Sequence, residues 1–525
     1  MPGVMQDVAT HPLDWLVILP VVLSLIGAAL LLVLREAREA QYWLALALVA
    51  VVLATDLALV LRVGEVGPVS MTMGRWLPPF GISFTADIAS AVFALAAAGV
   101  TLAVLVYLRH DMPDRARRDG AYPLVLLLLA GVSGAFLTGD LFNLYVWFEV
   151  MLISSFGLMV LGGRSIQLDG AVKYGFLNFL ATTIFLLALG LLYGTLGTLN
   201  MADIIARAAQ AEPAVMASIA ALLLLAFGMK AAAFPVNAWL PASYHAPPAA
   251  ISALMAGLLT KVGVYALLRV LAMLLPASRE VLDPILMAVA VATLILGPLG
   301  AIAETNLRRA LGFLVIGGIG ASLAGLAIGD EAGLAGGATY VLHAMLTMTA
   351  LYLLAGLIET ITGEMDTRRM GGLYAAASLP SALFFVLMLA VSGVPPFLGF
   401  WPKLLLVEGG IEAWRAGAGG WALAAWIAVL ANALLTLIAG SRLWAHIFWR
   451  PGHEDATTEA PNPDLKRLDR AGLWLGLGST GVLTAAVLLL GLWPEPLLGF
   501  GKAAAAALLH PADYIAATGL EGAAP

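Results

Sequence analysis

The chain consists mostly of long apolar runs separated by short polar loops. A helix crosses the hydrocarbon core of a bilayer with about 20 predominantly apolar residues. Fourteen runs of this kind occur, at residues 15–34, 42–61, 86–108, 121–138, 141–161, 174–194, 214–234, 248–268, 284–303, 310–328, 332–357, 378–407, 420–447 and 471–493. This pattern predicts an all-α polytopic membrane protein with about 14 transmembrane helices, and it leaves no room for a soluble catalytic domain.

Composition narrows the class further. Charged residues are 11% of the 525 positions and hydrophobic residues 61%, whereas soluble domains carry about 25% charged residues. The net charge is −6 and the sequence has no basic tract, so it shows no sign of a nucleic-acid-binding surface. The absence of Cys excludes disulfides, iron–sulfur clusters and Cys-ligated zinc, and we expect no other metal or cofactor. If the protein serves a redox machine, the electrons must travel in another subunit.

The distribution of Lys and Arg predicts the orientation. With the N-terminus outside, sixteen of the 27 basic residues fall in cytoplasmic loops and seven in outer loops. Because cytoplasmic loops carry the excess of positive charge, we expect both termini outside. Asp14, and no Lys or Arg, precedes the first run, so we interpret that run as a retained span and not as a cleaved signal.

Four basic residues lie inside the predicted spans: Lys230, Lys261, Lys403 and Arg442. One acid, Glu149, lies about nine residues into its span, roughly 13 Å deep. A charged side chain at the centre of a membrane helix costs about 2.5 to 3.5 kcal/mol. A single lysine of this kind often forms a static ion pair or snorkels to the interface. Three lysines cannot all pair statically with one glutamate, which favours a functional role.

Other polar groups in or near the spans have simpler interpretations. Arg442 lies near the cytoplasmic end of its span, where snorkelling explains its charge. Three glutamates stand at span ends, where we expect them to be solvated: Glu304, Glu359 and Glu408.

Two histidines and a threonine are candidates for proton transfer. His343 lies well inside the eleventh span and is a candidate to bridge the gap between Lys261 and Lys403, since imidazole exchanges protons near neutral pH; the alternative is a hydrogen-bonded core residue. Thr347, one turn further along the same face, is a candidate to hold a water. His245, at the cytoplasmic end of the seventh span, is a candidate entry group or an ordinary loop residue.

Prolines stand beside two of the lysines. Pro235 follows Lys230 by five residues, and Pro395 and Pro396 precede Lys403 by seven to eight. A proline inside a helix frees a backbone carbonyl, which lipid tolerates only against protein or water. Paired broken helices typically mark inverted repeats that meet at a midplane site, although they are also found as simple kinks. We therefore expect broken seventh and twelfth helices, with two inverted five-helix repeats over spans 4–8 and 9–13.

The repeats divide the chain into four segments. Residues 1–120 hold spans 1–3, 121–275 the first repeat and 276–447 the second repeat. Residues 448–525 hold a cytoplasmic loop, span 14 and a short outer tail.

Three segments carry a resemblance to a known family: GDLFNLYVWFEVMLISSFGLM (139–159), FPVNAWLPASYHAPPAAISALMAGLLTKVGVYALLR (234–269) and SGVPPFLGFWPKLLL (392–406). The chain resembles the antiporter-like subunits shared by Mrp-type cation/proton antiporters, respiratory complex I and membrane-bound hydrogenases, over about residues 15–493. The amino-acid sequence of these segments is most similar to the D-subunit branch of the Mrp type. The most similar complex I subunit tends to carry Glu in the twelfth span at the position of Lys403. The lysine in this chain therefore also favours the Mrp type.

The resemblance implies roles for the buried groups. Glu149 is the carboxylate that modulates Lys230, the seventh-span proton carrier. Lys261 is the central relay and Lys403 the terminal group. A lateral chain through Lys230, Lys261, His343 and Lys403 then joins a cytoplasmic half-channel to an outer one. The implied partners are other membrane subunits of the complex, protons, Na⁺ (through this chain or a partner subunit) and the lipid bilayer of the bacterial inner membrane.

Three functions fit these observations. The first is a proton-translocating subunit of a hetero-oligomeric Na⁺/H⁺ antiporter, a secondary transporter and not an enzyme. The second is a proton-pumping subunit of respiratory complex I or a membrane-bound hydrogenase, driven by redox chemistry elsewhere. The third is a structural subunit that keeps these charges as relics. The identity of the co-purifying proteins discriminates between the first two.

Overall fold

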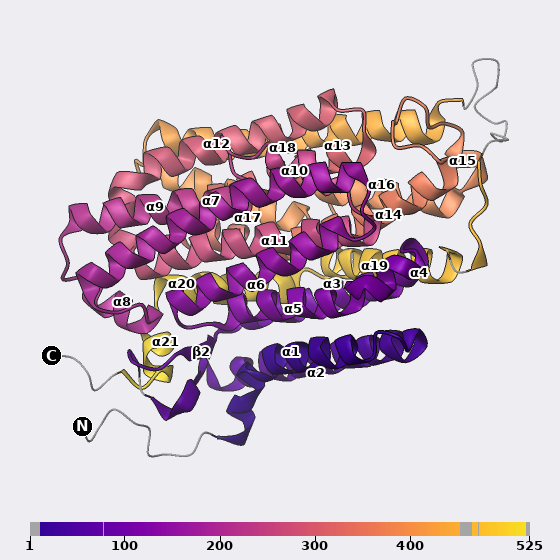
Figure 1. Cartoon of the computed structure of the whole chain (residues 1–525). Coiled ribbons are helices and arrows are strands. Elements are labelled where there is room, and N and C mark those ends of the chain that lie inside the picture. The colour runs from indigo at the N-terminus through magenta and orange to yellow at the C-terminus, as the bar shows by residue number, and fades with distance from the viewer. Residues whose placement is uncertain (1–10, 77, 452–464, 471, 521–525) are drawn as a thin grey trace.

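The fold is a bundle of long helices, described here from a computed structural model over residues 11–76, 78–451, 465–470 and 472–520. Figure 1 shows the helices running side by side along one common direction. Twelve helical segments in the described residues are long and apolar enough to cross a membrane. They are built on α2 (Arg38–Val66), α3 (Ile88–Asp111), α5 (Tyr122–Leu137), α6 (Leu141–Val160), α7 (Ser165–Leu196), α9 (Pro213–Ala231), α11 (Ala249–Leu267), α12 (Arg279–Ala303), α13 (Leu307–Ile328), α14 (Glu331–Thr362), α18 (Gly420–Trp444) and α19 (Gly478–Leu492).

Several of these helices continue into tighter or wider turns. The extensions are η3 (Arg117–Ala121) before α5, η4 (Leu268–Leu274) after α11, η5 (Pro276–Ser278) before α12, η6 (Ala445–Trp449) after α18 and η7 (Gly472–Leu477) before α19. The shorter helices are η1 (Pro12–Val17), α1 (Leu19–Val33), η2 (Met73–Arg75), α4 (Asp114–Ala116), α8 (Met201–Ala208), α10 (Trp239–Tyr244), α15 (Leu373–Ala376), α16 (Ser378–Ser392), α17 (Phe400–Arg415), α20 (Glu495–Leu509) and α21 (Ala512–Ala517).

Two membrane helices are interrupted beside lysine residues. α9 ends at Ala231, and α10 begins only at Trp239. The run predicted as one span at 378–407 is two helices, α16 and α17, separated by residues 393–399. This gap is the break expected in the twelfth helix, and it arises because Pro395 and Pro396 cannot supply the amide hydrogens that a helix needs there.

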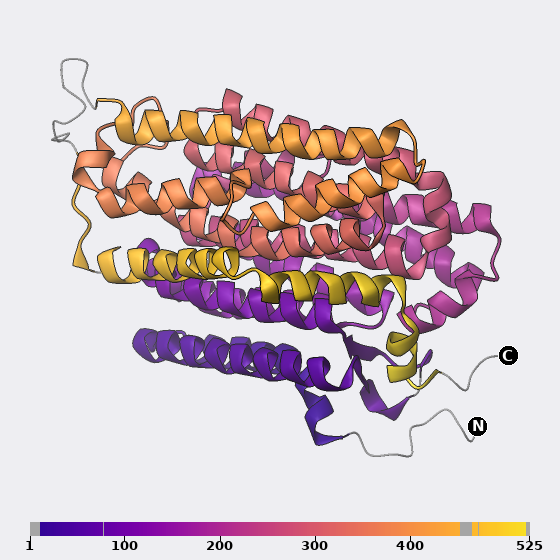
Figure 2. The same cartoon turned by 180° about the vertical axis from the view of Figure 1, so that it is seen from behind.

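The last predicted span also ends differently. α19 ends at Leu492, and after a short interruption at residues 493–494 the chain continues as α20. Gly476 of η7 lies against Leu357 of α14, and Gly501 of α20 lies against Thr339, so α19 and α20 together follow α14 over most of its length. Figure 2 shows these two yellow helices in line on one side of the bundle. Much of the predicted outer tail is therefore part of the helical body.

A small β-hairpin lies at one end of the bundle. β1 (Val69–Thr72) pairs antiparallel with β2 (Ser83–Ala86), in the register Val69 with Ala86. Both η1 and α21 pack against β1, so the first and last described helices meet at this end, which we call the termini side. An all-α prediction omits this hairpin, because it falls in a polar loop between two spans.

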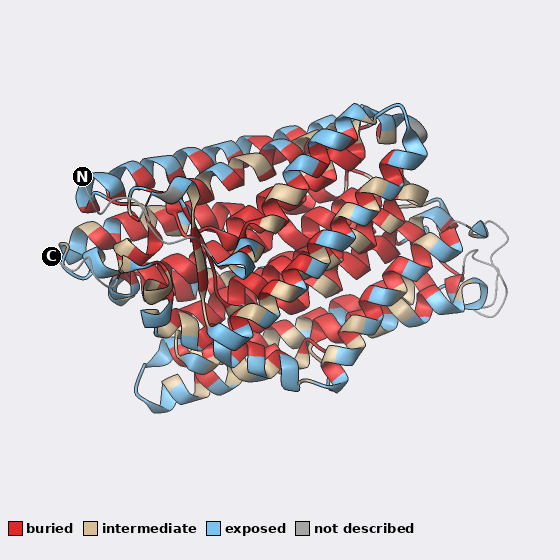
Figure 3. Cartoon of the chain, turned by 90° about the horizontal axis from the view of Figure 1, so that it is seen from below, coloured by how far each residue is buried: buried red, intermediate tan, exposed pale blue. Residues whose placement is uncertain are grey.

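α11 and α14 form the centre of the bundle. Both are buried along their whole apolar stretch, and they pack directly against each other. Figure 3 shows buried residues concentrated in the interior, with exposed residues on the outer helices. In a membrane those outer apolar surfaces face lipid, so charges on the two central helices have protein surroundings only.

Asp140 caps α6 between two spans and gives a pH-dependent contribution to stability. Its Oδ1 accepts a hydrogen bond of 2.8 Å from the backbone N–H of Asn143. Burial raises the pKa of Asp140 from 3.8 to about 6, outweighing backbone hydrogen bonds that lower it. The folded state therefore holds the proton more tightly than the unfolded state. This contribution is complete below pH 3.8 and disappears as the pH rises through about 6.

We expect Asp140→Asn to remove this pH dependence while keeping the cap, because Asn also caps helices well. The stability of the wild type relative to the variant should fall by up to about 3 kcal/mol over that pH range. Thermal unfolding of both proteins against pH measures the difference. A difference that stays constant with pH would contradict the expectation.

Candidate functional site

Four charge-bearing side chains lie buried at mid-depth in the bundle. Lys230, Lys261, Lys403 and His343 are all 5% exposed or less. Lys230 is at the C-terminal end of α9 and Lys403 is in the first turn of α17, so each lies directly at a helix break. Lys261 and His343 lie near the middle of α11 and α14. The structure thus places all three predicted lysines and the predicted histidine in the protein interior.

Lys230 faces an aromatic wall and a small cavity. Its Nζ lies 4.8 Å from the centre of the Phe148 ring, a cation–π contact. A cavity of about 10 Å³ touches Lys230, Phe148, Trp239 and Asn178, which is about the volume that one water needs. On the far side of this cavity the hydroxyl of Tyr174 bonds Ser155 at 2.6 Å.

Glu149 does not form an ion pair with Lys230. Among the described residues no cation lies within ion-pair distance of this carboxylate, and its Oε1 has no hydrogen-bond partner. The side chain is half-buried, whereas the sequence predicts a fully buried acid. Glu149 follows Phe148, whose ring contacts Lys230, so the structure shows the two charges in neighbouring positions but separated.

Lys261 faces the helix that carries His343. Gly257, one turn before Lys261 on the same face of α11, lies against Met345 and Thr349 of α14. The two helices run in opposite directions, so one turn further along α11 corresponds to one turn earlier on α14, the level of His343. The Lys261 ammonium donates to the carbonyl of Ala256 in its own helix.

His343 is held between a hydroxyl and a helix break. Its Nδ1 lies 3.1 Å from the hydroxyl of Thr347, so Thr347 contacts the imidazole directly, and the ring packs edge-on against Tyr340. Its Nε2 points at Gly399, where an added Cβ would lie 2.9 Å away. The imidazole thus joins α14 to the segment that precedes Lys403.

Lys403 folds back across the break in its own span. Its Nζ donates to the carbonyls of Val391 and Ser392, at 3.1 and 3.0 Å. These carbonyls belong to the last turn of α16, where a helix leaves acceptors unpaired. The break beside Pro395 and Pro396 therefore provides the acceptors that hold the buried ammonium.

The predicted entry histidine lies between α10 and α11. His245 is half-buried, and its Nδ1 bonds the carbonyl of Pro241 at 3.0 Å. Burial, together with the charges of Arg309 and Arg308, lowers the pKa of this imidazole. His245 is therefore neutral at physiological pH. Pro235 lies in the break between Lys230 and α10.

Gly399 offers a test of the contact between His343 and the break. A Cβ at this position would lie 2.0 Å from the carbonyl oxygen of Ala390, so Gly399→Ala must shift the break, although its φ of −70° suits alanine. We expect a clearly lower unfolding temperature with the chain still in the membrane. Gly190→Ala, where a Cβ meets nothing within 4 Å, is the matched control. An unfolding temperature of Gly399→Ala equal to that of the control would contradict the expectation.

The sequence interpretation misses a buried ion pair. Arg269 is one of the seven basic residues that the sequence places in outer loops. It is 1% exposed in η4, and its Nη2 lies 2.5 Å from Oδ2 of Asp87. The apolar run at 248–268 continues helically to Leu274, which moves this arginine from the interface into the protein. The partner stands far away in the sequence, so no local pattern indicates it.

A second polar cluster lies at the end of the bundle opposite the termini. Arg308 bonds Glu359 at 2.9 Å, and both line a cavity of about 380 Å³ with Asp111 and Arg164. Glu359 is thus paired and nearly buried, whereas the sequence predicts a solvated side chain. Glu304, also predicted to be solvated, pairs with Arg309 at 3.2 Å.

Asp56 is a further buried acid that the sequence interpretation overlooks. It lies in the middle of α2 and is 0% exposed. The signal is present in the sequence, because Asp56 interrupts the apolar run at 42–61 as Glu149 interrupts its own run.

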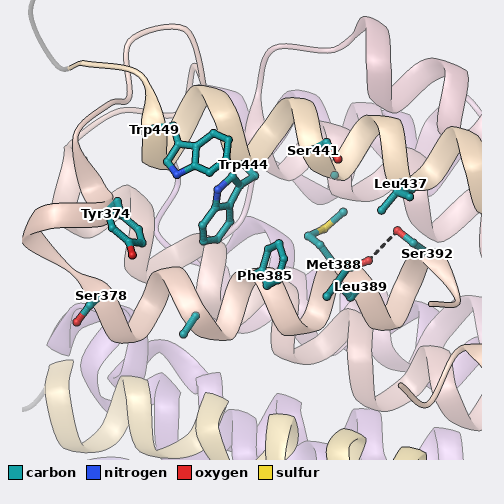
Figure 4. Close-up of a pocket in the computed structure, with 12 residues that line it drawn as sticks. Tyr374, Ser378, Phe385, Met388, Leu389, Ser392, Leu437, Ser441, Trp444 and Trp449 are labelled. Carbon is teal, nitrogen blue, oxygen red and sulfur yellow. Dashed lines mark hydrogen bonds between the residues drawn. The ribbon is translucent and has the colours of Figure 1, made fainter. Parts of the chain in front are cut away.

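A large apolar groove lies on the surface of the described part of the chain. It encloses about 660 Å³ between α16 and α18. Figure 4 shows Trp444, Phe385 and Met388 pointing into it, with Ser392 at one end. Its lining holds no charged side chain, so it is not a candidate ion site.

Ionisable side chains buried inside apolar membrane-spanning helices are typical of ion and proton pathways. The family model described as "NADH:quinone oxidoreductase/Mrp antiporter, TM" matches residues 138–431. The chain belongs to this family.

Two individual relatives are both D subunits of Na⁺/H⁺ antiporters. The D subunit of the Na⁺/H⁺ antiporter of Bacillus subtilis (strain 168) is 35% identical over 502 residues, which cover 95% of this chain and 98% of the relative. The corresponding protein of Alkalihalophilus pseudofirmus, with the same name, is 34% identical over 503 residues, with the same coverage. These matches confirm the family that the sequence motifs predict.

Solved structures agree with this result. A chain in the structure of the Mrp complex from Dietzia sp. DQ12-45-1b superposes with a TM-score of 0.88 at 31% identity, covering 97% of this chain and 100% of that one. A chain of respiratory complex I from Thermus thermophilus superposes with a TM-score of 0.77 at 25% identity, covering 95% and 99%.

Proposed function

We propose that this chain is the proton-translocating subunit of a hetero-oligomeric Na⁺/H⁺ antiporter. The observation that carries the proposal is the placement of Lys230, Lys261, His343 and Lys403 at mid-depth, with the last two meeting at a helix break. The likeness to an Na⁺/H⁺ antiporter protein over 95% of the chain supports the same conclusion.

The proposed mechanism depends on the distance between Glu149 and Lys230. A carboxylate that approaches a buried lysine strengthens the hold of the lysine on its proton, and withdrawal weakens it. The separated arrangement seen here corresponds to the releasing state. The proton then moves to Lys261 and through His343 to Lys403. Groups coupled in this way titrate as a set and not one by one.

We further propose the arrangement in the membrane. Fourteen crossings result if α1 and the broken pair α16–α17 each span the bilayer in addition to the twelve long helices. The four segments predicted from the sequence, with their inverted repeats over spans 4–8 and 9–13, remain part of this proposal. Both termini then lie outside the bacterial inner membrane, which places the Arg308–Glu359 cavity and His245 on the cytoplasmic side. Na⁺ crosses in a partner subunit or at its interface.

Purification of the full chain from native membranes tests this function. We expect several small membrane proteins to co-purify, and we expect the reconstituted complex to show Na⁺-driven pH changes in vesicles. Co-purification with iron–sulfur proteins and no Na⁺ response would instead support a proton-pumping subunit of a redox enzyme, which the likeness to complex I also permits.

A further inference from the structure

Asp56 lies on the buried stripe of α2. The stripe consists of Ala45, Val49, Val52, Asp56, Leu59 and Val63, which follow one another at helical spacing and are all nearly inaccessible. Asp56 is 0% exposed, and neither of its carboxylate oxygens has a hydrogen-bond partner. The neighbouring hydroxyl of Thr55 is already bonded to the carbonyl of Val51. Asp56 therefore differs from the other polar residues of α2, which contact a polar or aromatic partner or are exposed to solvent.

The helices around α2 offer no charge to Asp56. α2 packs against η1, α1, α3 and α5, and within the described residues α1 carries no ionisable side chain. The ionisable groups on the other elements and on α2 itself stand towards the two ends of the helices. They are Asp14, Arg62 and Glu65 with the capping Asp87 at the termini side, and Arg38, Glu39, Tyr42, Tyr107, Arg109, His110, Asp111 and Tyr122 towards the opposite end. Arg62, which stands nearest in the sequence, pairs with Asp14 at 3.6 Å.

These surroundings fit a protonated acid. An ionised carboxylate in an apolar interior without a partner is so costly that the group takes up a proton instead. A sodium ion would need several oxygen ligands at once, and no cluster of three or more acidic or histidine side chains that suits a cation occurs in the described residues. A single proton needs only the carboxylate itself.

A cavity at the termini side touches the last turns of α2. It encloses about 430 Å³, and its lining includes Val63, Gly64, Asp87, His510 and Tyr514. Val63 lies two turns beyond Asp56 on the same stripe, about 10 Å along the helix. Leu59 is the one stripe residue between them. The cavity therefore ends about two helical turns from the acid, with Leu59 between them.

We propose that Asp56 is a proton-binding site that exchanges its proton with water through this cavity. It belongs to the helices before the first repeat and uses none of the residues assigned to the lysine chain. The proposal stands whether or not the chain serves an antiporter.

Infrared difference spectroscopy of the full chain, purified with its partners in lipid, tests the binding. A protonated carboxylic acid gives a C=O stretching band above the amide I band. At a pH well above 6, where Asp140 is ionised, we expect one component of this band in the wild type, its loss in Asp56→Asn and its retention in Glu149→Gln. Asn has the size and shape of Asp, so the variant keeps the packing of α2. Identical wild-type and Asp56→Asn spectra in this region would show that Asp56 is ionised and would overturn the proposal.

The route is tested by the exchange of the same proton for deuterium. The band shifts down on transfer to D₂O, and the rate of the shift reports access to water. Gly64 lines the cavity, and a Cβ there meets nothing within 4 Å, as is also true of Gly190 on α7. We expect Gly64→Phe to slow the shift several-fold and Gly190→Phe to leave it unchanged. Equal rates in these two variants would overturn the route through the cavity.

Discussion

Replacing Lys403 by Ala is expected to abolish Na⁺-driven proton transport, and replacing it by Arg is expected to do the same. The ammonium of Lys403 donates to the carbonyls of Val391 and Ser392, so Lys403→Ala removes both a proton carrier and two hydrogen bonds. Arg keeps the charge and the donors. A guanidinium does not release its proton in proteins, so Lys403→Arg keeps the positive charge and removes the ability to carry a proton.

The comparison separates a proton carrier from a structural lysine. We expect Lys403→Arg to assemble into the complex at a level close to wild type and to transport at background rates. Lys173→Ala is the control, because Lys173 is exposed and pairs with Asp169 on its own helix. Near-normal transport by Lys403→Arg would mean that Lys403 has a structural role.

Loss of Arg269 is expected to cause the largest fall in stability. Its guanidinium bonds Asp87 at 2.5 Å and the hydroxyl of Tyr265 at 3.0 Å, and it lies over the ring of Tyr514. One side chain thus joins α3, α11 and the C-terminal helix α21. Removing one partner of a buried ion pair leaves an uncompensated charge and costs about 3 to 5 kcal/mol.

Thermal unfolding of Arg269→Leu measures this effect. We expect a clearly lower unfolding temperature, and partial recovery when Asp87→Asn is added, because the second change removes the unpaired carboxylate. Breaking the exposed Lys173–Asp169 pair should cost no more than about 0.5 kcal/mol and is the matched control. An unfolding temperature of Arg269→Leu equal to that of the control would contradict a stabilising role for the pair.

The sequence is sufficient to predict the membrane class and the buried lysines. Hydrophobic runs mark the long helices because lipid requires them, and charges inside such runs stand out against this background. The same rule that singles out Glu149 also finds Asp56. The breaks at Pro235 and at Pro395 are predictable because proline cannot donate a backbone hydrogen bond.

Contacts between distant parts of the chain are not predictable in this way. The partner of Arg269 is Asp87 on another helix, and hydropathy places Arg269 just beyond a span. The position of α20 against α14 is likewise a matter of tertiary packing, since its alanine-rich sequence is too short to read as a span. The separation of Glu149 from Lys230 depends on side-chain conformation, on which the sequence is silent.

The most direct test of the central claim is the Na⁺-driven pH change in vesicles that contain the complete complex with Lys261→Ala. Lys261 lies on the face of α11 that packs against α14, at the level of His343, and a proton passing from Lys230 to Lys403 must cross this place. We predict that the variant assembles with its partners and shows no Na⁺-dependent pH change. A pH change equal to that of the wild type would contradict the relay.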